Sequence, residues 1–136
     1  WGFTQSPASG PSNANILQKA TLRIFKNDDC QAKYTLAIEQ VTENMICALG
    51  SSNEDACVND SGGPLVVKEG NSWVVVGLVS WGPNNDCGGI DGKPGVYTRV
   101  GNYLDWIGSN INRASTCPRA GTPRNDNSFR NSFGIF

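Results

Sequence analysis

Histidine is the most informative absence from this 136-residue sequence, which contains none. Histidine is the usual side chain that changes charge near neutral pH, and it is the usual general base of hydrolytic enzymes. A chain without it cannot by itself carry out histidine-based hydrolysis or offer an imidazole ligand to zinc.

Charge and hydropathy argue against two further classes of protein. The 11 Lys and Arg residues face 12 Asp and Glu residues, and the resulting net charge of −1 argues against a nucleic-acid surface, which needs a basic patch. The longest apolar run is Trp73–Val79, whereas a membrane helix needs about 20 residues. The first residues, Trp1 to Thr4, have neither the basic head nor the apolar stretch of a signal peptide. These features predict a soluble domain.

The sequence has five cysteines, and no two of them form a C-x-x-C pair. This spacing argues against a zinc ribbon and favours disulfides formed in an oxidising compartment. An odd number leaves at least one cysteine without a partner in the chain, and the sequence alone leaves the pairing open. The 16 glycines, sparse charge and frequent Trp are typical of β-structure.

Alternation and apolar runs predict an antiparallel β-domain that ends in a helix. The segments expected as strands are 20–25, 45–48, 64–68, 72–80 and 95–100, with the third and fourth forming a hairpin. A short helix is expected from Asn27 through Tyr34, and an amphipathic helix from about Asn102 to Asn112. The first 18 residues are rich in Ser, Asn, Pro and Gly and are expected as a loop.

Composition divides the chain after Arg113. Residues 1–113 are expected as one domain, whereas residues 114–136, rich in Ser, Asn, Pro and Arg, are expected as a flexible C-terminal extension. The last residues, Phe133–Phe136, are apolar and leave open the alternative that this end docks on the domain.

The segment Asp60–Pro64 (Asp-Ser-Gly-Gly-Pro) is the stretch best suited to chemistry. A Ser followed by two glycines suits a tight turn, because glycine permits close approach and unusual dihedral angles. Such a turn can present a hydroxyl while neighbouring backbone N–H groups point to one spot, as an oxyanion site requires. Taken alone, a Ser in a glycine turn is more often only a turn.

Several segments that follow one another in order resemble the trypsin/chymotrypsin family of serine proteases. They are Trp1-Gly2, Cys57, Asp60–Pro64, Ser80-Trp81-Gly82, Cys87, Pro94–Tyr97 and Tyr103–Ile107. The resemblance covers residues 1–113. It implies an all-β fold, an antiparallel six-stranded barrel that is the second barrel of the chymotrypsin-like double barrel, followed by a C-terminal helix. A narrower likeness is to two-chain invertebrate trypsins, including fibrinolytic proteases of earthworms.

The resemblance makes Ser61 the nucleophile of a serine endopeptidase, with the backbone N–H groups of Asn59 and Ser61 as the oxyanion hole. The family carries its catalytic His and Asp in the first barrel, which accounts for the missing histidine. Asp60 would pair with the α-amino group that activation cleavage frees. Trp1 is not the Ile or Val that usually supplies this group, so base and ammonium would both come from a partner chain.

Asn59 departs from the family, which nearly always has Gly at this position. Asn is the next most tolerant residue at positive φ, so an active enzyme is expected. The departure leaves open the alternative of a catalytically weak or inactive homologue that acts as a binding module.

Asp55 matches the floor of the family's primary specificity pocket. A carboxylate in a narrow pocket is costly to desolvate unless a cation arrives, so Asp55 would select Arg or Lys before the scissile bond. The alternative is an ordinary solvated loop Asp, and Tyr97 would either line the rear of the pocket or belong to the core. The other substrate-binding residues implied are Ala56, Gly82 and Gly95 around the pocket, and Ser80 and Trp81 along the substrate backbone.

The resemblance pairs Cys30 with Cys47 and Cys57 with Cys87. Cys117 is left over and is expected to form an interchain disulfide, the alternative being a free thiol. The implied partners are a second protease chain carrying the His and Asp, and protein or peptide substrates; no nucleic acid and no membrane is expected. No metal or organic cofactor is implied, and the protein is expected to be secreted.

Overall fold

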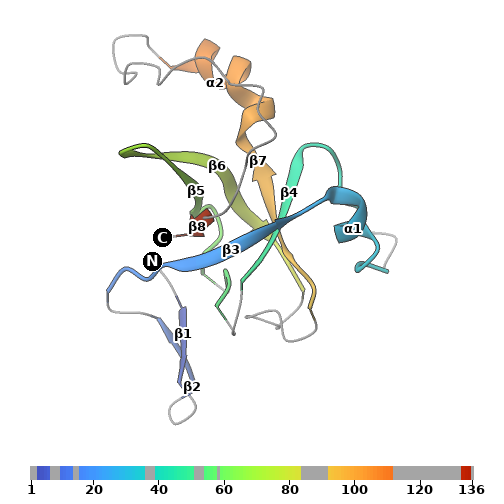
Figure 1. Cartoon of the computed structure of the whole chain (residues 1–136), viewed down its shortest axis with the longest axis vertical. Coiled ribbons are helices and arrows are strands. Elements are labelled where there is room, and N and C mark those ends of the chain that lie inside the picture. Colours follow the sequence, from blue (N-terminus) through green and yellow to red (C-terminus); the bar gives the residue numbers. More distant parts are fainter. Residues whose placement is uncertain are drawn as a thin grey trace.

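The structure, a computed structural model, describes residues 3–6, 10–13, 16–35, 39–50, 54–57, 59–83, 92–111 and 133–135. Its elements in chain order are β1 (Phe3–Ser6), β2 (Gly10–Asn13), β3 (Ala20–Phe25), α1 (Asn27–Gln31), β4 (Met45–Gly50), β5 (Pro64–Glu69), β6 (Ser72–Trp81), β7 (Gly95–Arg99), the 3₁₀ helix η1 (Val100–Tyr103), α2 (Leu104–Asn110) and β8 (Phe133–Ile135). Antiparallel strands dominate, and a helix follows the last long strand (Figure 1). The expected combination of antiparallel β-structure and a helix after it is therefore confirmed.

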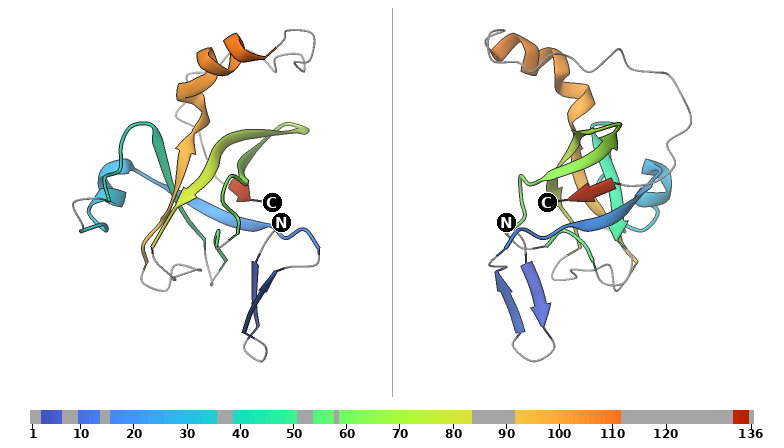
Figure 2. Two further views of the ribbon diagram at one scale, coloured as in Figure 1. Left: turned by 180° about the vertical axis from the view of Figure 1, so that it is seen from behind. Right: turned by 60° about the vertical axis from the view of Figure 1, so that its left-hand side comes forward.

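Six strands pair side by side in a closed barrel, in the order β3-β4-β7-β6-β5-β8. Every neighbouring pair in this ring is antiparallel. Five of the strands are the segments that alternation predicts, and β5 and β6 form the expected hairpin around Gly70, whose φ is +58°. The sixth strand, β8, belongs to the C-terminal extension and lies between β3 and β5 in both views of Figure 2.

The core inside this ring is built from apolar residues of the neighbouring strands. Its buried members are Ala20, Leu22, Ile46, Ala48, Leu65 and Tyr97. Successive side chains of a strand point to opposite faces, so residues two apart, as in β3 and β4, share the inner face. Gly77 of β6 completes the packing, because a Cβ atom there would lie 3.2 Å from side-chain atoms of both Leu65 and Tyr97.

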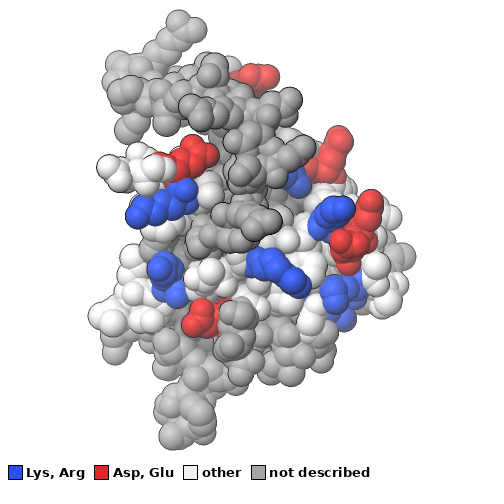
Figure 3. Space-filling model, in the orientation of Figure 1, with Lys and Arg blue, Asp and Glu red and all other residues white. Residues whose placement is uncertain are grey.

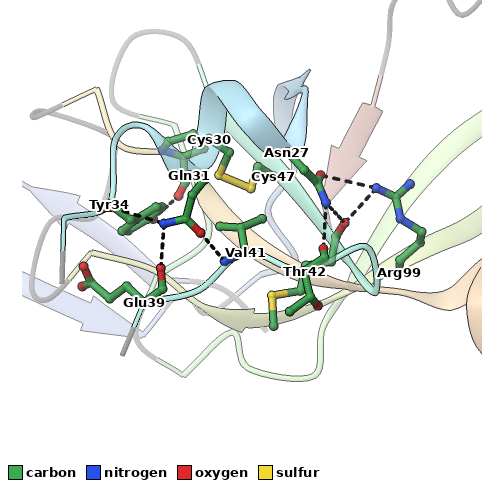
Figure 4. The surroundings of a disulfide bond; sticks show 11 residues. Asn27, Cys30, Gln31, Tyr34, Glu39, Val41, Thr42, Cys47 and Arg99 are labelled. Carbon is green, nitrogen blue, oxygen red and sulfur yellow. Dashed lines mark hydrogen bonds between the residues drawn. A yellow bond between two sulfur atoms is a disulfide. The ribbon is translucent and has the colours of Figure 1, made fainter. Parts of the chain in front are cut away.

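A second apolar cluster surrounds the disulfide between Cys30 and Cys47, the first of the two intrachain pairs that the family resemblance implies. The bridge joins α1 to β4 (Figure 4). Both cysteines are fully buried, and Tyr34 and Val96 complete the cluster. The short helix α1, which lacks the length to be stable alone, is therefore held to the barrel covalently and by apolar contact.

Gln31 organises the connection between α1 and β4 (Figure 4). Its side-chain Nε2 donates hydrogen bonds to the carbonyl oxygens of Tyr34 at 3.3 Å and Glu39 at 3.1 Å, and its Oε1 accepts one from the Val41 N–H at 2.7 Å. One side chain thus satisfies three backbone groups of a connection that contains no regular element among its described residues.

The expectation of a loop over the first 18 residues is wrong for β1 and β2, which form a two-stranded antiparallel sheet separate from the ring (Figure 1). Its register runs from Phe3 opposite Asn13 to Ser6 opposite Gly10. Composition misled the prediction here, because Ser, Asn and Pro are usually depleted from sheets. A two-stranded sheet has only edge strands, and an edge tolerates Pro11, which has no N–H to donate.

Helix α2 lies where the amphipathic pattern predicts a helix, but η1 replaces its first turn. None of its residues, all of which the structure describes, is buried, and Leu104 and Trp106 are 58% and 66% exposed. The helix extends away from the barrel in Figure 1. Its apolar side chains are therefore not covered by the described part of this chain. Among the described residues, no helix is long and apolar enough to cross a membrane.

Candidate active site

Ser61 is exposed on a tight turn that precedes β5. The Asp60 N–H donates to the Cys57 carbonyl oxygen at 3.0 Å, and the Gly63 N–H donates to the Asp60 carbonyl oxygen at 2.8 Å. A Cβ atom on Gly63 would lie 2.8 Å from that same oxygen, which is closer than real Cβ contacts come. The turn therefore needs glycine at this position, and the turn presents the Ser61 side chain to solvent.

The turn is fastened to β6 by two backbone hydrogen bonds. The Gly62 N–H donates to the Val79 carbonyl oxygen, and the Val79 N–H donates to the Gly63 carbonyl oxygen, each at 2.9 Å. These bonds continue the pairing of β5 and β6 up to the turn. They fix the position of Ser61 relative to Ser80 and Trp81 at the end of β6.

Asn59 has a φ of 75° and is the only non-glycine residue with positive φ in the described part of the chain. A left-handed conformation is costly for most L-residues, and Asn is among the few that adopt it routinely. The expectation that Asn can take the conformation that Gly has in the family is thus supported by the backbone itself. Its role as an oxyanion donor stays a prediction.

Asp60 is half-buried, and only one of its two carboxylate oxygens has a hydrogen bond among the described residues. Its Oδ2 accepts a hydrogen bond from the Cys57 N–H at 2.8 Å, whereas its Oδ1 is buried and has no hydrogen-bond partner among the described residues. Burial raises the pKa of the Asp60 carboxyl, and the bond from Cys57 partly opposes this. An ionised carboxylate with one unsatisfied buried oxygen is suited to receive a positively charged donor.

Asp55 is half-buried and accepts a hydrogen bond from the Ala56 N–H at 2.8 Å. Tyr97 is fully buried, and burial raises the pKa of its hydroxyl; the negative charges of Asp55 and Asp60 raise it further. Both carboxylates therefore lie near one buried tyrosine. Tyr97 belongs both to the core, as one reading of the sequence had it, and to the surroundings of Asp55.

Gly82 and Gly95 lie close together at the ends of β6 and β7. A Cβ atom on Gly82 would lie 3.7 Å from the Gly95 Cα, and a Cβ atom on Gly95 would lie 3.4 Å from the Tyr97 ring. Side chains at these two positions would occupy the space between the strand ends. The structure thus brings both glycines together beside Tyr97 and, through Tyr97, near Asp55.

Tyr34 also belongs to this region, although no sequence pattern selects it. Its hydroxyl donates a hydrogen bond to the Pro94 carbonyl oxygen, directly before Gly95. Its ring meets Trp81 edge-on with ring centroids 5.0 Å apart, and its burial raises the pKa of its hydroxyl. Trp81 is half-buried in this contact, so it packs in the cluster around the disulfide while ending β6. No spacing or motif distinguishes Tyr34 from any other tyrosine near a cysteine.

The structure describes some of the remaining site residues and not others. Ala56 is half-buried and packs against the barrel core, Ser80 is exposed, and Cys57 is disulfide-bonded. Cys87 and Cys117 lie outside the described residues, so the pairing of Cys57 with Cys87 and the interchain bridge stay predictions.

Neither a metal cluster nor a basic patch marks the described surface in view. No three His, Cys, Asp or Glu side chains of the described residues are grouped as a metal ion would need. Basic and acidic side chains are intermingled on the face shown in Figure 3.

Comparison with known proteins gives matches over most of the chain. The family model described as trypsin matches residues 1–107. Tissue-type plasminogen activator of Sus scrofa is 42% identical over 116 residues, which cover 80% of this chain and 20% of that protein. Urokinase-type plasminogen activator of Gallus gallus is 44% identical (79% and 24%), and kallikrein-12 of Homo sapiens is 43% identical (79% and 39%). The chain thus spans between 20% and 39% of the length of these relatives.

Replacing Asn59 by Gly and by Ala tests the conformation of the turn. Both variants lack the Asn side chain, but Gly adopts positive φ freely whereas Ala does so at a cost of about 1 kcal/mol. We expect the free energy of unfolding of Asn59→Ala, measured by urea titration, to be lower than that of Asn59→Gly by about this amount. The same pair at exposed Asn71, whose φ is not positive, is the control, and Ala should be at least as stable as Gly there. The same order at both positions would contradict the strained turn.

Replacing Asp60 by Asn tests the buried carboxylate. Asn keeps an oxygen for the Cys57 N–H but carries no charge. Since the pKa of Asp60 is raised in the folded state, the folded chain binds this proton more tightly than the unfolded chain does. The wild type therefore loses stability as pH rises from below the unfolded value of about 3.9 to above the folded one.

We therefore expect the stability of Asp60→Asn relative to the wild type to increase as pH rises from about 3 to about 7, in urea titrations of this chain without a partner. Asp105→Asn on the exposed helix α2 controls for the loss of one negative charge. The prediction would be contradicted if the difference in free energy of unfolding between Asp60→Asn and wild type stayed constant over this pH range. It would also be contradicted if Asp105→Asn showed the same change with pH.

Proposed function

Because the chain belongs to the trypsin family of serine proteases, we propose that it is the part of a serine endopeptidase that supplies the nucleophile, the oxyanion hole and an Arg/Lys-selective pocket. A partner chain supplies the His and Asp of the triad. The observation that carries the proposal is the turn of Ser61, exposed and fastened to β6, with Asn59 in a left-handed conformation two residues before it.

In the proposed reaction, the Ser61 Oγ attacks the carbonyl carbon of the scissile peptide bond. The partner's histidine takes the Ser61 proton and later gives it to the leaving amine, and the partner's aspartate orients that histidine. The backbone N–H groups of Asn59 and Ser61 stabilise the negative charge that develops on the carbonyl oxygen. One such donor is worth about 10²–10³ in turnover, so the conformation of Asn59 directly affects the rate.

Asp60 is proposed to accept an ammonium group from the partner chain. Support comes from its Oδ1, which is buried without a hydrogen-bond partner among the described residues. A cation placed there satisfies the oxygen and compensates the buried charge. Because Asp60 directly precedes Ser61 and its other oxygen is bonded to the Cys57 N–H, this ion pair would restrict the nucleophile turn.

Selectivity for Arg or Lys is proposed to come from Asp55. The carboxylate lies near Tyr97, and Gly82 and Gly95, which lie close together beside that ring, place no side chains of their own there. A guanidinium presents a planar fork of donors that matches a carboxylate, and Ala56 offers no hydroxyl to help a shorter Lys, so Arg is favoured. The exposed end of β6 at Ser80 would pair with the substrate backbone.

The partner chain is supported by large apolar side chains that this chain leaves uncovered. The exposed ones among the described residues are Ile16, Leu17, Trp73, Val75, Leu78, Tyr103, Leu104, Trp106 and Ile111. Exposed apolar surface of this kind is typical of protein–protein contact. We propose that the partner covers α2, that Cys117 beyond it forms an interchain disulfide, and that the protein acts outside the cell, where disulfides persist.

Asn59 also supports a second candidate, a catalytically weak or inactive homologue that serves as a binding module. A non-glycine residue in a left-handed conformation costs free energy, which could alter the position of the oxyanion donor. The two candidates share the fold and the pocket, and they differ only in whether Ser61 is reactive.

Labelling with a fluorophosphonate separates the two candidates. In the assembly of this chain with its partner, we expect the probe to label Ser61 stoichiometrically, because a neighbouring base activates that hydroxyl. Ser61→Ala should abolish labelling, and the matched change Ser72→Ala, at an exposed serine that begins β6, should leave it intact. Absence of labelling in a wild-type assembly would favour the binding module.

Replacing Asp55 by Asn tests the pocket. We expect the ratio of kcat/KM for a peptide with Arg before the scissile bond to that for one with Leu there to fall about a hundredfold or more, because a buried charge pair loses one partner. Glu54→Gln, the same kind of change at the exposed neighbouring residue, should leave the ratio unchanged. An equal loss with both peptides would place Asp55 outside the pocket.

A further inference from the structure

Asn59 and Ser61 are both exposed, and the residue between them is directed inward. Asp60 has one carboxylate oxygen buried and the other bonded to the Cys57 N–H, so its side chain faces the interior. Two steps along a chain span at most about 7 Å, so the side chain of Asn59 lies within a few ångströms of whatever is bound at Ser61. A peptide that extends in both directions from Ser61 therefore passes close to the Asn59 side chain.

The backbone of the turn holds this side chain in place. Asn59 has a φ of 75°, and the hydrogen bonds from the Asp60 N–H to Cys57 and from the Gly63 N–H to Asp60 close the turn after it. Since the backbone conformation determines the direction of the Cα–Cβ bond, only rotation about the side-chain bonds is left to move the amide. The amide group is thus a fixed feature of the surface beside Ser61.

The two sides of Ser61 differ in what they offer to a substrate. On one side, Gly62 and Gly63 are bonded to Val79 of β6, and the proposed function assigns the exposed end of β6 to the substrate residues before the scissile bond. Asn59 lies on the other side of Ser61 along the chain. An extended peptide leaves the reacting carbonyl in opposite directions, so its residues after the scissile bond extend away from β6 and toward Asn59.

The chemistry of an amide determines which substrate residues this position accepts. An Asn side chain has two donor hydrogens, one acceptor oxygen and no charge. A small side chain leaves the amide hydrated, and a polar side chain replaces that water with a hydrogen bond. A large apolar side chain covers the amide without offering a partner, which costs free energy.

We propose that the Asn59 side chain is a specificity-determining group of the substrate-binding surface. It favours a small or hydrogen-bonding residue directly after the scissile bond over a large apolar one. The inference rests on the proposed function, because that function places a peptide substrate at Ser61. It concerns the side chain of Asn59, whereas the proposed oxyanion hole uses the backbone N–H of the same residue.

Asn59→Asp turns the amide into a charge reporter of nearly the same shape, because Asp also adopts positive φ. In the assembly with the partner chain, kcat/KM is measured for two peptides that carry Glu or Gln directly after the scissile bond. We expect the Glu-to-Gln ratio to fall at least about threefold in the variant, since two like charges a few ångströms apart repel. Asn71→Asp, at another exposed asparagine, is the matched control and should leave the ratio unchanged.

Asn59→Gly tests the effect of size. It removes the side chain and the backbone strain together, but an effect of strain on the oxyanion hole changes all substrates by the same factor and cancels from a ratio. We expect the ratio of kcat/KM for a peptide with Leu after the scissile bond to that for one with Ala to rise at least about threefold. This variant also keeps the inference testable if Asn59→Asp does not fold.

Peptide binding to assemblies that carry Ser61→Ala separates this inference from the proposed function, because binding requires no catalysis. The Glu and Gln peptides are labelled with a fluorophore, and their Kd values are measured by anisotropy. Adding Asn59→Asp should weaken binding of the Glu peptide relative to the Gln peptide at least about threefold. This result supports the inference even if the fluorophosphonate fails to label wild-type Ser61, which would count against the proposed reaction alone.

Four results overturn the inference. An unchanged Glu-to-Gln ratio in Asn59→Asp places the side chain away from the bound peptide, and an unchanged Leu-to-Ala ratio in Asn59→Gly removes the preference for small residues. An equal or larger effect of Asn59→Asp on Glu and Gln placed three residues before the scissile bond puts the side chain on the side of β6. Absence of binding by both labelled peptides at about 1 mM contradicts a substrate-binding surface at this turn.

Discussion

Two hydrogen bonds between Val79 and the glycines that follow Ser61 position the rest of the site. They connect the Ser61 turn to β6, and β6 in turn pairs with β7, where Gly95 and Tyr97 lie. The turn and the surroundings of Asp55 are thereby parts of one hydrogen-bonded sheet. A shift of β6 along its neighbours would move Ser61 and the candidate pocket together, so the sheet preserves the distance between them.

The carboxylates of the site lie close to buried surface, and one of them is incompletely hydrogen-bonded among the described residues. Asp60 has a buried oxygen without a hydrogen-bond partner there, and both Asp55 and Asp60 raise the pKa of one buried tyrosine. Leaving carboxylates so close to buried surface costs stability unless cations compensate them. The proposed substrate supplies one cation and the proposed partner supplies the other. The sequence contains no histidine, so the base of the proposed reaction also lies outside it.

Much of this structure could be predicted from patterns along the sequence and from the conformational preferences of single residues. Features that depend on contacts between distant segments could not. Alternation and apolar runs located strands β3 to β7. The tolerance of Asn for positive φ anticipated the backbone conformation at Asn59. The apolar sequence of 133–136 left docking of this end open as an alternative. Its pairing as strand β8 was beyond prediction, because three residues show no period and their partners in β3 and β5 lie far away in the sequence. Tyr34 was also beyond it, since its place depends on a tertiary contact with Pro94. The exposure of α2 was unpredictable for a different reason: its amphipathic pattern predicts an apolar face packed on a partner, and no described residue of this chain covers that face.

The Ser61 turn is constrained from both of its ends, and the two constraints have different origins. On the side of Asp60, a single carboxylate joins the turn to Cys57 and has one oxygen left for a cation from elsewhere. On the side of Pro64, β5 is paired with β6 and, through its other edge, with β8. Because a strained residue such as Asn59 persists only where its surroundings over-determine it, both ends must be held for that conformation to be stable. Closure of the barrel by the chain's own C-terminal segment and association with a partner would therefore act on the same few bonds.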